Sequence, residues 1–336
     1  MRKVLLALLA TLLIGTTAAW WWIQDANRLK PRLEAFLHAQ TGAAVTIEGD
    51  LSWGLVAPIS LTAERVSIDY GGDEAVIGQL AMVIDVLSLL RELRAIETWE
   101  VRSITITDAE VHSALDRITI HSLSLVDFAL NRPTPFATSL LYETPGAIPR
   151  PIDANGLLVL GSHGSMHLAN TMFSTTETKG VCDVDAEPVT SPDSPIAPKS
   201  DDLIPLDLLY AWDASIKCTL DQLELQAESF PDVHLTLRAA DDRVTGDIEM
   251  PRFLGGSATT SFDLDARRPP LRWRLRPQLH SVDSQRLMNW LKQPLTWAAP
   301  LDGEGGFDLL GNTEAELIAS IKGGWSASTI SFAGDN

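Results

Sequence analysis

The stretch "DVHLTLRAADDRVTGDIEM", residues 232–250, predicts a β-hairpin. Val233, Leu235 and Leu237 alternate with polar residues, which is the two-residue period of a strand with one apolar face. Two aspartates, 241 and 242, mark the turn, and the alternation resumes at Val244. The stretch therefore predicts two antiparallel strands that share one apolar face.

The same alternation recurs on both sides of this hairpin. In "LRWRLRP", residues 271–277, Leu271, Trp273 and Leu275 point one way and the three arginines 272, 274 and 276 point the other way. We expect this arginine row to be an outward strand face that neutralises nearby carboxylates, rather than a binding site. Nearer the N-terminus, "ISLTAERVSIDY" (residues 59–70) carries two alternating segments on one face, with a break between them.

Short helices are predicted between the groups of strands. Residues 27–40 have leucines at helical spacing, with Pro31 in the first turn and Gly42 as a C-terminal stop. Residues 203–212 and the segment "SVDSQRLMNWLKQ" (residues 281–293) predict two more helices. The predicted fold class is α+β and mostly antiparallel β: an N-terminal transmembrane helix, then an elongated, curled, groove-like β-sheet with short interspersed helices.

The N-terminal segment Val4–Ile23 has no charged residue over 20 positions, which is the length that a helix needs to cross a bilayer. Trp20, Trp21 and Trp22 suit an aromatic belt at the far interface, and the positive-inside rule keeps Arg2 and Lys3 in the cytoplasm. Cleavage near Ala19, as in a signal peptide, is the alternative. The predicted anchor residues are Val4, Leu5, Leu6, Leu8, Leu9, Leu12, Leu13, Ile14, Trp20, Trp21, Trp22 and Ile23.

Composition restricts the partners. The formal net charge of −18 argues against a nucleic-acid partner, because phosphate binding needs a basic face. Any lipid contact beyond the anchor is then expected to be mainly apolar. Cys182 and Cys218 are the only cysteines. They either form a disulfide in an oxidising compartment or stay as two free thiols, and their spacing does not decide between these states.

Residue patterns for catalysis are absent from the sequence. His163 and His167 are four residues apart, but the Gly/Ser-rich segment around them does not predict a helix, and further zinc ligands are missing nearby. The segments "GSHGS" and "GWSAS" both miss the G-x-S-x-G nucleophile motif. We therefore predict no catalytic residues, no metal site and no cofactor, and we expect that the protein is not an enzyme.

Four regions follow from these patterns: an anchor (1–24), a β-rich region (25–173), a low-complexity flexible loop or linker rich in Ser, Thr, Pro and Asp (174–202), and a second β-rich region (203–336). The apolar strand faces either close against each other in a sandwich or line an open trough. If they line a trough, the candidate groove residues are Ile216, Leu220, Leu235, Leu237, Phe262, Leu264, Leu271, Trp273 and Leu275.

Two stretches of the chain resemble the AsmA family of bacterial envelope proteins. The first is "TGAAVTIEGDLSWGLVAPISLTAERVSIDYGG" (41–72), continued by "VLSLLRELRAIETWEVRSITITDAEV" (86–111). The second runs from "IPLDLLYAWDASIKCTLDQLEL" (204–225) to "LLGNTEAELIASIKGGWSAS" (309–328). The order is that of the family's N-terminal region and its repeated downstream module. Together the stretches cover about two-thirds of the chain.

The resemblance implies a single-pass protein of the bacterial inner membrane, with its bulk in the periplasm and a role in outer-membrane biogenesis. It implies phospholipid binding or conduction along an apolar β-groove, and an influence on the factors that assemble outer-membrane proteins. The alternative is a structural or regulatory scaffold that binds no lipid. We expect the downstream module to be truncated. About 15 strands at about 4.8 Å each span roughly 70 Å. We therefore expect the chain to bridge the two membranes only in part or with partners.

Overall fold

The computed structural model describes residues 26–41, 44–54, 58–70, 73–84, 101–112, 117–129, 131–143, 148–161, 164–189, 206–226, 228–294 and 299–329. These residues form eighteen strands and a few short helices, and the strand pairings within each unit described below are antiparallel. The prediction of a mostly antiparallel β protein with short helices is confirmed. The chain divides into two compact units: residues 1–129 with 134–149, and residues 130–133 with 150–336.

Unit 1 is one ladder of seven described strands. β1 and β2 lie one after the other along the same edge of β3, and β3, β4, β5, β6 and β7 follow in order. A 3-10 helix, η1, and the helix α2 precede them. The bounds are η1 (Ala26–Leu29), α2 (Lys30–Thr41), β1 (Ala44–Ile47), β2 (Leu51–Gly54), β3 (Ser60–Tyr70), β4 (Asp73–Ile84), β5 (Val101–His112), β6 (Arg117–Val126) and β7 (Thr134–Glu143).

Residues with positive φ explain the break in the apolar pattern of residues 59–70. Arg65 has a φ of 49° and Asp108 a φ of 53°. The alternation of side chains is interrupted at each of them, while β3, β4 and β5 keep their register on both sides. Gly49 lies opposite this part of β3, where a Cβ would be 2.3 Å from the carbonyl oxygen of Glu64. Leu61, before Arg65, and Val66, after it, therefore both enter the core of unit 1.

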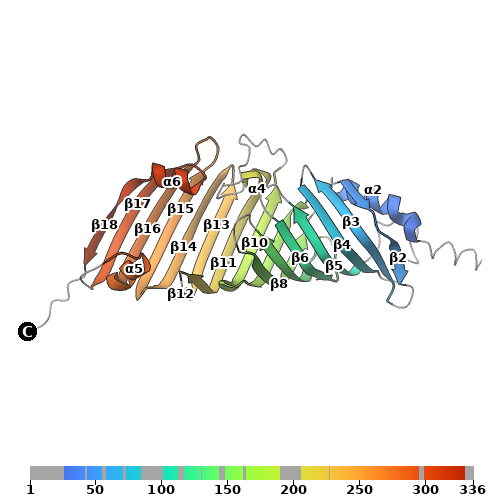
Figure 1. The fold of residues 1–336 in the computed structure, drawn as a ribbon, viewed down its shortest axis with the longest axis horizontal. Coiled ribbons are helices and arrows are strands. Elements are labelled where there is room, and N and C mark those ends of the chain that lie inside the picture. The colour runs from blue at the N-terminus through green and yellow to red at the C-terminus, as the bar shows by residue number, and fades with distance from the viewer. Residues whose placement is uncertain are drawn as a thin grey trace, which may run out of the picture. The chain divides into compact units, whose positions relative to one another are not determined.

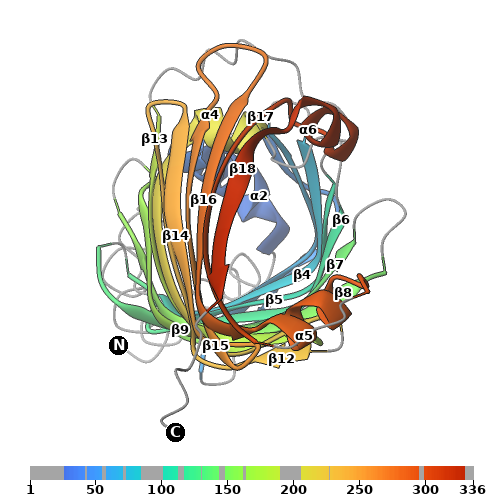
Figure 2. The same ribbon diagram turned by 90° about the vertical axis from the view of Figure 1, so that its left-hand side faces the viewer.

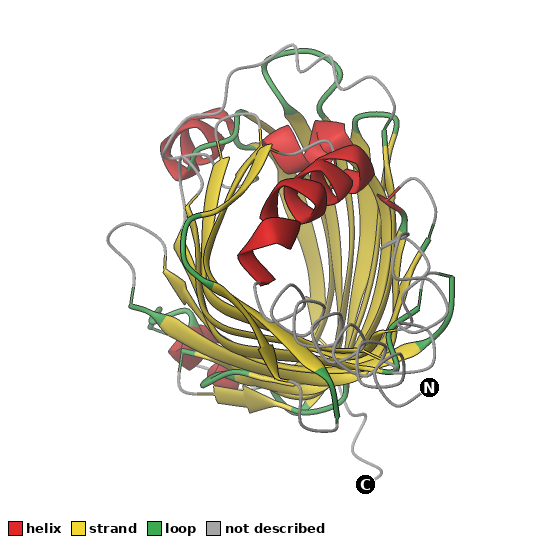
Figure 3. Ribbon diagram, turned by 90° about the vertical axis from the view of Figure 1, so that its right-hand side faces the viewer, coloured by secondary structure: helices red, strands yellow, loops and turns green. Residues whose placement is uncertain are grey.

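The helical segment of unit 1 covers the outer edge of its first strands. The Ile47 N–H donates to Glu34 Oε1 at 2.8 Å, and the Leu51 N–H donates to Asn27 Oδ1 at 2.9 Å. Leu33 of α2 is 4% exposed and packs in the core of unit 1. The predicted helix over residues 27–40 is confirmed, and Figure 3 shows it as the longest helix, lying beside the strands.

Unit 2 is a ladder of eleven described strands that follow one another in chain order, except that β12 and β13 lie one after the other along the same edge of β11 (Figure 1). The strand bounds are β8 (Arg150–Leu160), β9 (Met166–Ser174), β10 (Thr178–Pro188), β11 (Trp212–Leu225), β12 (Glu228–Phe230), β13 (Val233–Ala240), β14 (Arg243–Phe253), β15 (Gly256–Asp265), β16 (Arg272–Asp283), β17 (Pro300–Leu310) and β18 (Lys322–Thr329). The helix bounds are α4 (Leu206–Ala211), α5 (Ser284–Trp290) and α6 (Glu314–Ser320).

The short helices of unit 2 begin with local capping signals. Asp283 accepts hydrogen bonds from the N–H groups of Gln285 and Arg286 at the start of α5. Thr313 and Glu316 form a capping box at the start of α6. Such caps satisfy N–H groups that have no partner within the helix. The predicted helices near residues 203–212 and 281–293 are therefore confirmed as α4 and α5.

Two separate cores hold the two ends of the unit 2 strands. The α4 core contains Leu206, Leu209 and Tyr210 from the helix, packed on β13–β16, and the Tyr210 hydroxyl donates to the carbonyl of Ala266 at 2.9 Å. The α5 core contains Phe230, Phe253 and Leu287 at the opposite strand ends. The labelled strands of unit 2 bend along their length between α6 at one end and α5 at the other (Figure 2).

The expected loop over residues 174–202 is wrong in its first half. Thr178–Pro188 form β10, which pairs with β9 on one side and with β11 on the other. The inward positions of this strand hold small residues such as Gly180 and Ala186, so the apolar period is weak in the sequence. The two units also divide near residues 130 and 150 rather than within 174–202.

The predicted anchor Val4–Ile23 and the second half of the predicted loop, residues 190–202, lie outside the described residues. Within the described ranges, no helix is long and apolar enough to cross a bilayer.

Candidate functional site

An apolar row crosses the strands of unit 2 at right angles to the chain direction. Strand register places its members directly opposite one another: Val184 faces Ile216, Ile216 faces Leu237, and Phe262 faces Leu275. Opposed residues share one face of a sheet. We define the apolar row as Leu158, Leu168, Val184, Ile216, Leu237, Gly246, Phe262, Leu275 and Phe307.

The side chains of this row are half-buried, whereas the rows at either end of the strands are buried. Leu237 and Phe262 also contact the α4 core, and the remaining side chains of the row belong to neither core. A contiguous set of partly exposed apolar side chains is unfavourable in water and marks a binding surface. The row is therefore the strongest candidate site in the described part of unit 2.

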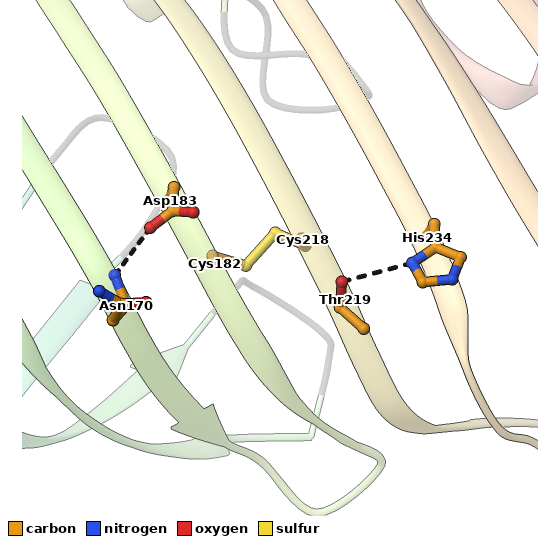
Figure 4. The surroundings of a disulfide bond; sticks show 6 residues. All are labelled: Asn170, Cys182, Asp183, Cys218, Thr219 and His234. Atoms are coloured by element: carbon orange, nitrogen blue, oxygen red, sulfur yellow. Dashed lines mark hydrogen bonds between the residues drawn. A yellow bond between two sulfur atoms is a disulfide. The ribbon is translucent and has the colours of Figure 1, made fainter.

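A second row runs beside the apolar row and contains the disulfide. Cys182 of β10 and Cys218 of β11 are register partners joined by a disulfide, with their Cα atoms 4.1 Å apart (Figure 4). Of the two states that the sequence left open, a disulfide or two free thiols, the structure therefore has the disulfide. Leu235 follows Cys218 across the sheet, and Thr171 precedes Cys182. The disulfide in this second row joins β10 covalently to β11 beside the apolar row.

A bulge keeps the two rows on one face at β9. Asn170 has a φ of 48°, and its N–H donates to Asp183 Oδ1 at 2.7 Å (Figure 4). The bulge shifts the register so that Leu168, before it, and Thr171, after it, both point to the apolar side. The hydroxyl oxygen of Thr171 is buried and has no hydrogen-bond partner.

The structure separates the nine predicted groove residues into three groups. Ile216, Leu237, Phe262 and Leu275 lie in the apolar row, and Leu235 lies in the row beside it. Trp273 is half-buried against the α4 core, and its indole N–H donates to the carbonyl of Gly311 at 2.9 Å. The other three are buried in the cores rather than available to a ligand: Leu220 (8% exposed), Leu264 (0%) and Leu271 (3%).

Five members of the row were not among the predicted residues: Leu158, Leu168, Val184, Gly246 and Phe307. Leu158 and Leu168 lie in a segment that predicts a strand pair, and Val184 lies in the segment that was expected to be a loop. Phe307 stands among the glycines 303, 305 and 306. Alternation within each strand was visible for most of them. Their membership in one row depends on register between strands, which the sequence of a single strand does not contain.

The opposite face of the sheet is polar and charged. Arg243 donates to both carboxylate oxygens of Asp263, at 2.7 and 2.5 Å, and this hydrogen-bonded pair lowers the pKa of Asp263. Arg274 lies 3.7 Å from Asp263 and 3.8 Å from Asp308. Arg272 and Arg276 are exposed. The prediction that the arginine row points outward and neutralises carboxylates is confirmed for Arg274.

Acidic groups at the α4 end are likewise held as ion pairs. The Arg267 guanidinium donates to the Asp265 carboxylate and lowers its pKa to about 2. The Arg267 side chain is 59% exposed and that of Asp265 is 33% exposed, so solvent screens the pair and it contributes at most about 1 kcal/mol to stability. This edge of the sheet therefore stays charged at neutral pH and does not extend the apolar surface.

Histidines on the polar face form exposed pairs with carboxylates. His280 Nδ1 lies 2.9 Å from Asp302 Oδ1, which also accepts the Ser281 N–H at 2.7 Å, and the His280 side chain is 76% exposed. An open pocket of about 590 Å³ surrounds this pair. His167 contacts Asp185 on β10. No group of three or more His, Cys, Asp or Glu side chains in the described residues is placed to hold a metal ion.

Comparisons with known proteins found no match: no protein-family model, no curated protein and no solved structure corresponds to this chain.

Proposed function

We propose that the chain is an inner-membrane-anchored periplasmic protein of outer-membrane biogenesis, and that the apolar row of unit 2 holds the acyl chains of phospholipid. The observation that carries this proposal is the row itself, half-buried between two closed cores. The resemblance of two sequence stretches to the AsmA family supports the same function.

The chemistry of the row favours a hydrocarbon ligand. Its side chains are aliphatic or phenyl groups, which offer dispersion contact and no hydrogen-bond partner. A ligand with buried polar groups would leave them unpaired there, at a cost of about 1–3 kcal/mol for each. The charged groups lie on the opposite face, in pairs such as Arg243–Asp263. The row therefore selects an apolar chain rather than a polar solute.

The dimensions of the row favour an extended ligand. It crosses nine strands of unit 2, which at about 4.8 Å per strand is a lane of roughly 40 Å. A surface much longer than it is wide suits a long flexible chain better than a compact ligand. An acyl chain that moves along the apolar row meets no polar side chain of the row. We therefore propose that phospholipid is conducted as well as bound.

A charged side chain introduced into the apolar row is expected to abolish lipid binding. In Leu275→Glu, a carboxylate replaces a half-buried side chain that belongs to neither core. Desolvating that carboxylate against an acyl chain is costly, while the fold tolerates it because water reaches the site. We expect bound phospholipid, measured by mass spectrometry after purification in mild detergent, to fall at least tenfold relative to the native protein.

Gln278→Glu is the matched control. It adds the same charge to the same strand, but at an exposed position on the polar face, and lipid content should not change. Deleting Val4–Ile23 separates lipid held by the β-region from lipid around the predicted anchor. If lipid disappears with the anchor and Leu275→Glu has no effect, the scaffold that binds no lipid becomes the better account.

A further inference from the structure

The two outer strand edges at the ends of the described chain differ in how they are protected. An edge strand exposes unpaired N–H and C=O groups that template pairing with another strand, so proteins usually cover it or place charges on it. In unit 1, the β1–β2 edge is covered. Side chains of η1 and α2 accept its N–H groups, Asn27 from Leu51 and Glu34 from Ile47.

In the part of the chain that the structure describes, the edge strand β18 of unit 2 has no such protection. Among the described residues its strand partner is β17, and residues 322–328 are all exposed. The sequence "KGGWSAST" contains no proline and no carboxylate, and its one charge, Lys322, stands at the first position. A strand of eight residues with these properties is long enough to pair with another strand along its outer edge.

Apolar surface continues to this edge. The indole of Trp325 lies over Gly303 and Gly305 of β17, where an added Cβ would come within 2.4–2.9 Å of its ring atoms. Trp325 is nevertheless 40% exposed. Gly323 pairs with Phe307, so the apolar row ends at β18 beside this indole. An extended partner strand would satisfy the backbone groups and cover the indole at the same time.

We propose that β18 pairs with β18 of a second copy of this chain, antiparallel, about a two-fold axis. A symmetric interface needs only one surface that is complementary to itself, and a strand edge meets this condition. The charge of −18 makes two copies repel each other over most of their surface, whereas β18 presents no carboxylate. Directly opposed residues share a face, so residues 323, 325 and 327 of both copies would extend the apolar face from one copy into the other.

A glycine pair provides a matched test in the full-length protein. Gly324 of β18 and Gly306 of β17 are register partners, and an added Cβ meets nothing within 4 Å at either position. Gly324→Glu places like charges at the two-fold interface, and we expect the dimer dissociation constant to rise at least tenfold, measured by native mass spectrometry in mild detergent. Gly306→Glu adds the same charge on an interior strand and should leave the dimer intact.

Cysteine cross-linking tests the antiparallel register independently. Both native cysteines are joined in a disulfide, so a cysteine introduced at Gly324, Ser326 or Ser328 is the single free thiol. We expect one of these positions to form an intermolecular disulfide on mild oxidation, and Thr259→Cys on the interior strand β15 to form none. A monomer with no cross-link, or a dimer that Gly324→Glu does not weaken, would overturn the proposal whether or not the protein binds lipid.

Discussion

Replacing Phe230 with alanine is expected to lower the free energy of unfolding by about 3–5 kcal/mol. Phe230 is 2% exposed in the α5 core. Its ring stacks on Phe253 with the ring centroids 5.2 Å apart, and meets Trp290 edge-on at 6.3 Å. Truncation removes these contacts and leaves a cavity between β12, β14 and α5.

Urea unfolding followed by tryptophan fluorescence measures this loss, and Trp290, which contacts Phe230, is one of the ten tryptophans that contribute to the signal. The neighbouring Ser229→Ala is the control, since Ser229 is exposed on the same short strand, and its free energy of unfolding should change by less than about 0.5 kcal/mol. A loss below about 1 kcal/mol for Phe230→Ala would mean that the α5 core is not closed as described.

Removing the disulfide with Cys182→Ala and Cys218→Ala together is expected to cost about 2–4 kcal/mol. The two residues are 36 positions apart, so the bond restricts a long loop of the unfolded chain. The loss should fall on unit 2, because the bond joins β10 to β11 in the middle of its ladder.

The measurement is denaturant unfolding of the native protein and of the double variant, each with and without a reductant. The native protein should lose stability on reduction, and the double variant should be insensitive to the reductant. If the native protein with and without reductant and the double variant all unfold at the same denaturant concentration, the two cysteines are not joined in the folded protein.

The sequence predicted those elements whose signals are local. The alternation of Val233, Leu235 and Leu237 predicted β13, and the break in residues 59–70 coincides with the positive φ of Arg65. Helix α2 followed from leucine spacing and Pro31. In each case side chains within one element carry the pattern, so no knowledge of neighbouring strands was needed.

The parts that were missed depend on partners far along the chain. β10 has small and charged residues, and it is a strand because β9 and β11 supply hydrogen bonds on both sides. Leu220, Leu264 and Leu271 looked like groove residues from alternation alone, yet α4 and α5 bury the strand ends where they lie. Alternation gives the face of a residue, whereas its position along the strand decides whether it is covered.

These positions also explain which substitutions are informative. Trp273 satisfied the sequence criteria for a groove residue, but its indole N–H is bonded to Gly311 and its ring packs on the α4 core. A charge there would disturb the fold and any ligand together. Leu275, two residues further along β16 on the same face and outside both cores, separates the two effects.

The central claim is that the apolar row of unit 2 contacts acyl chains, and site-specific photo-cross-linking in intact cells tests it most directly. A photoreactive amino acid would replace Ile216, a member of the row, or Lys217, its neighbour on the opposite face of β11. We predict a phospholipid adduct at position 216 and none at position 217, detected by mass spectrometry of the purified protein. No adduct at position 216, or equal adducts at both positions, would contradict the claim.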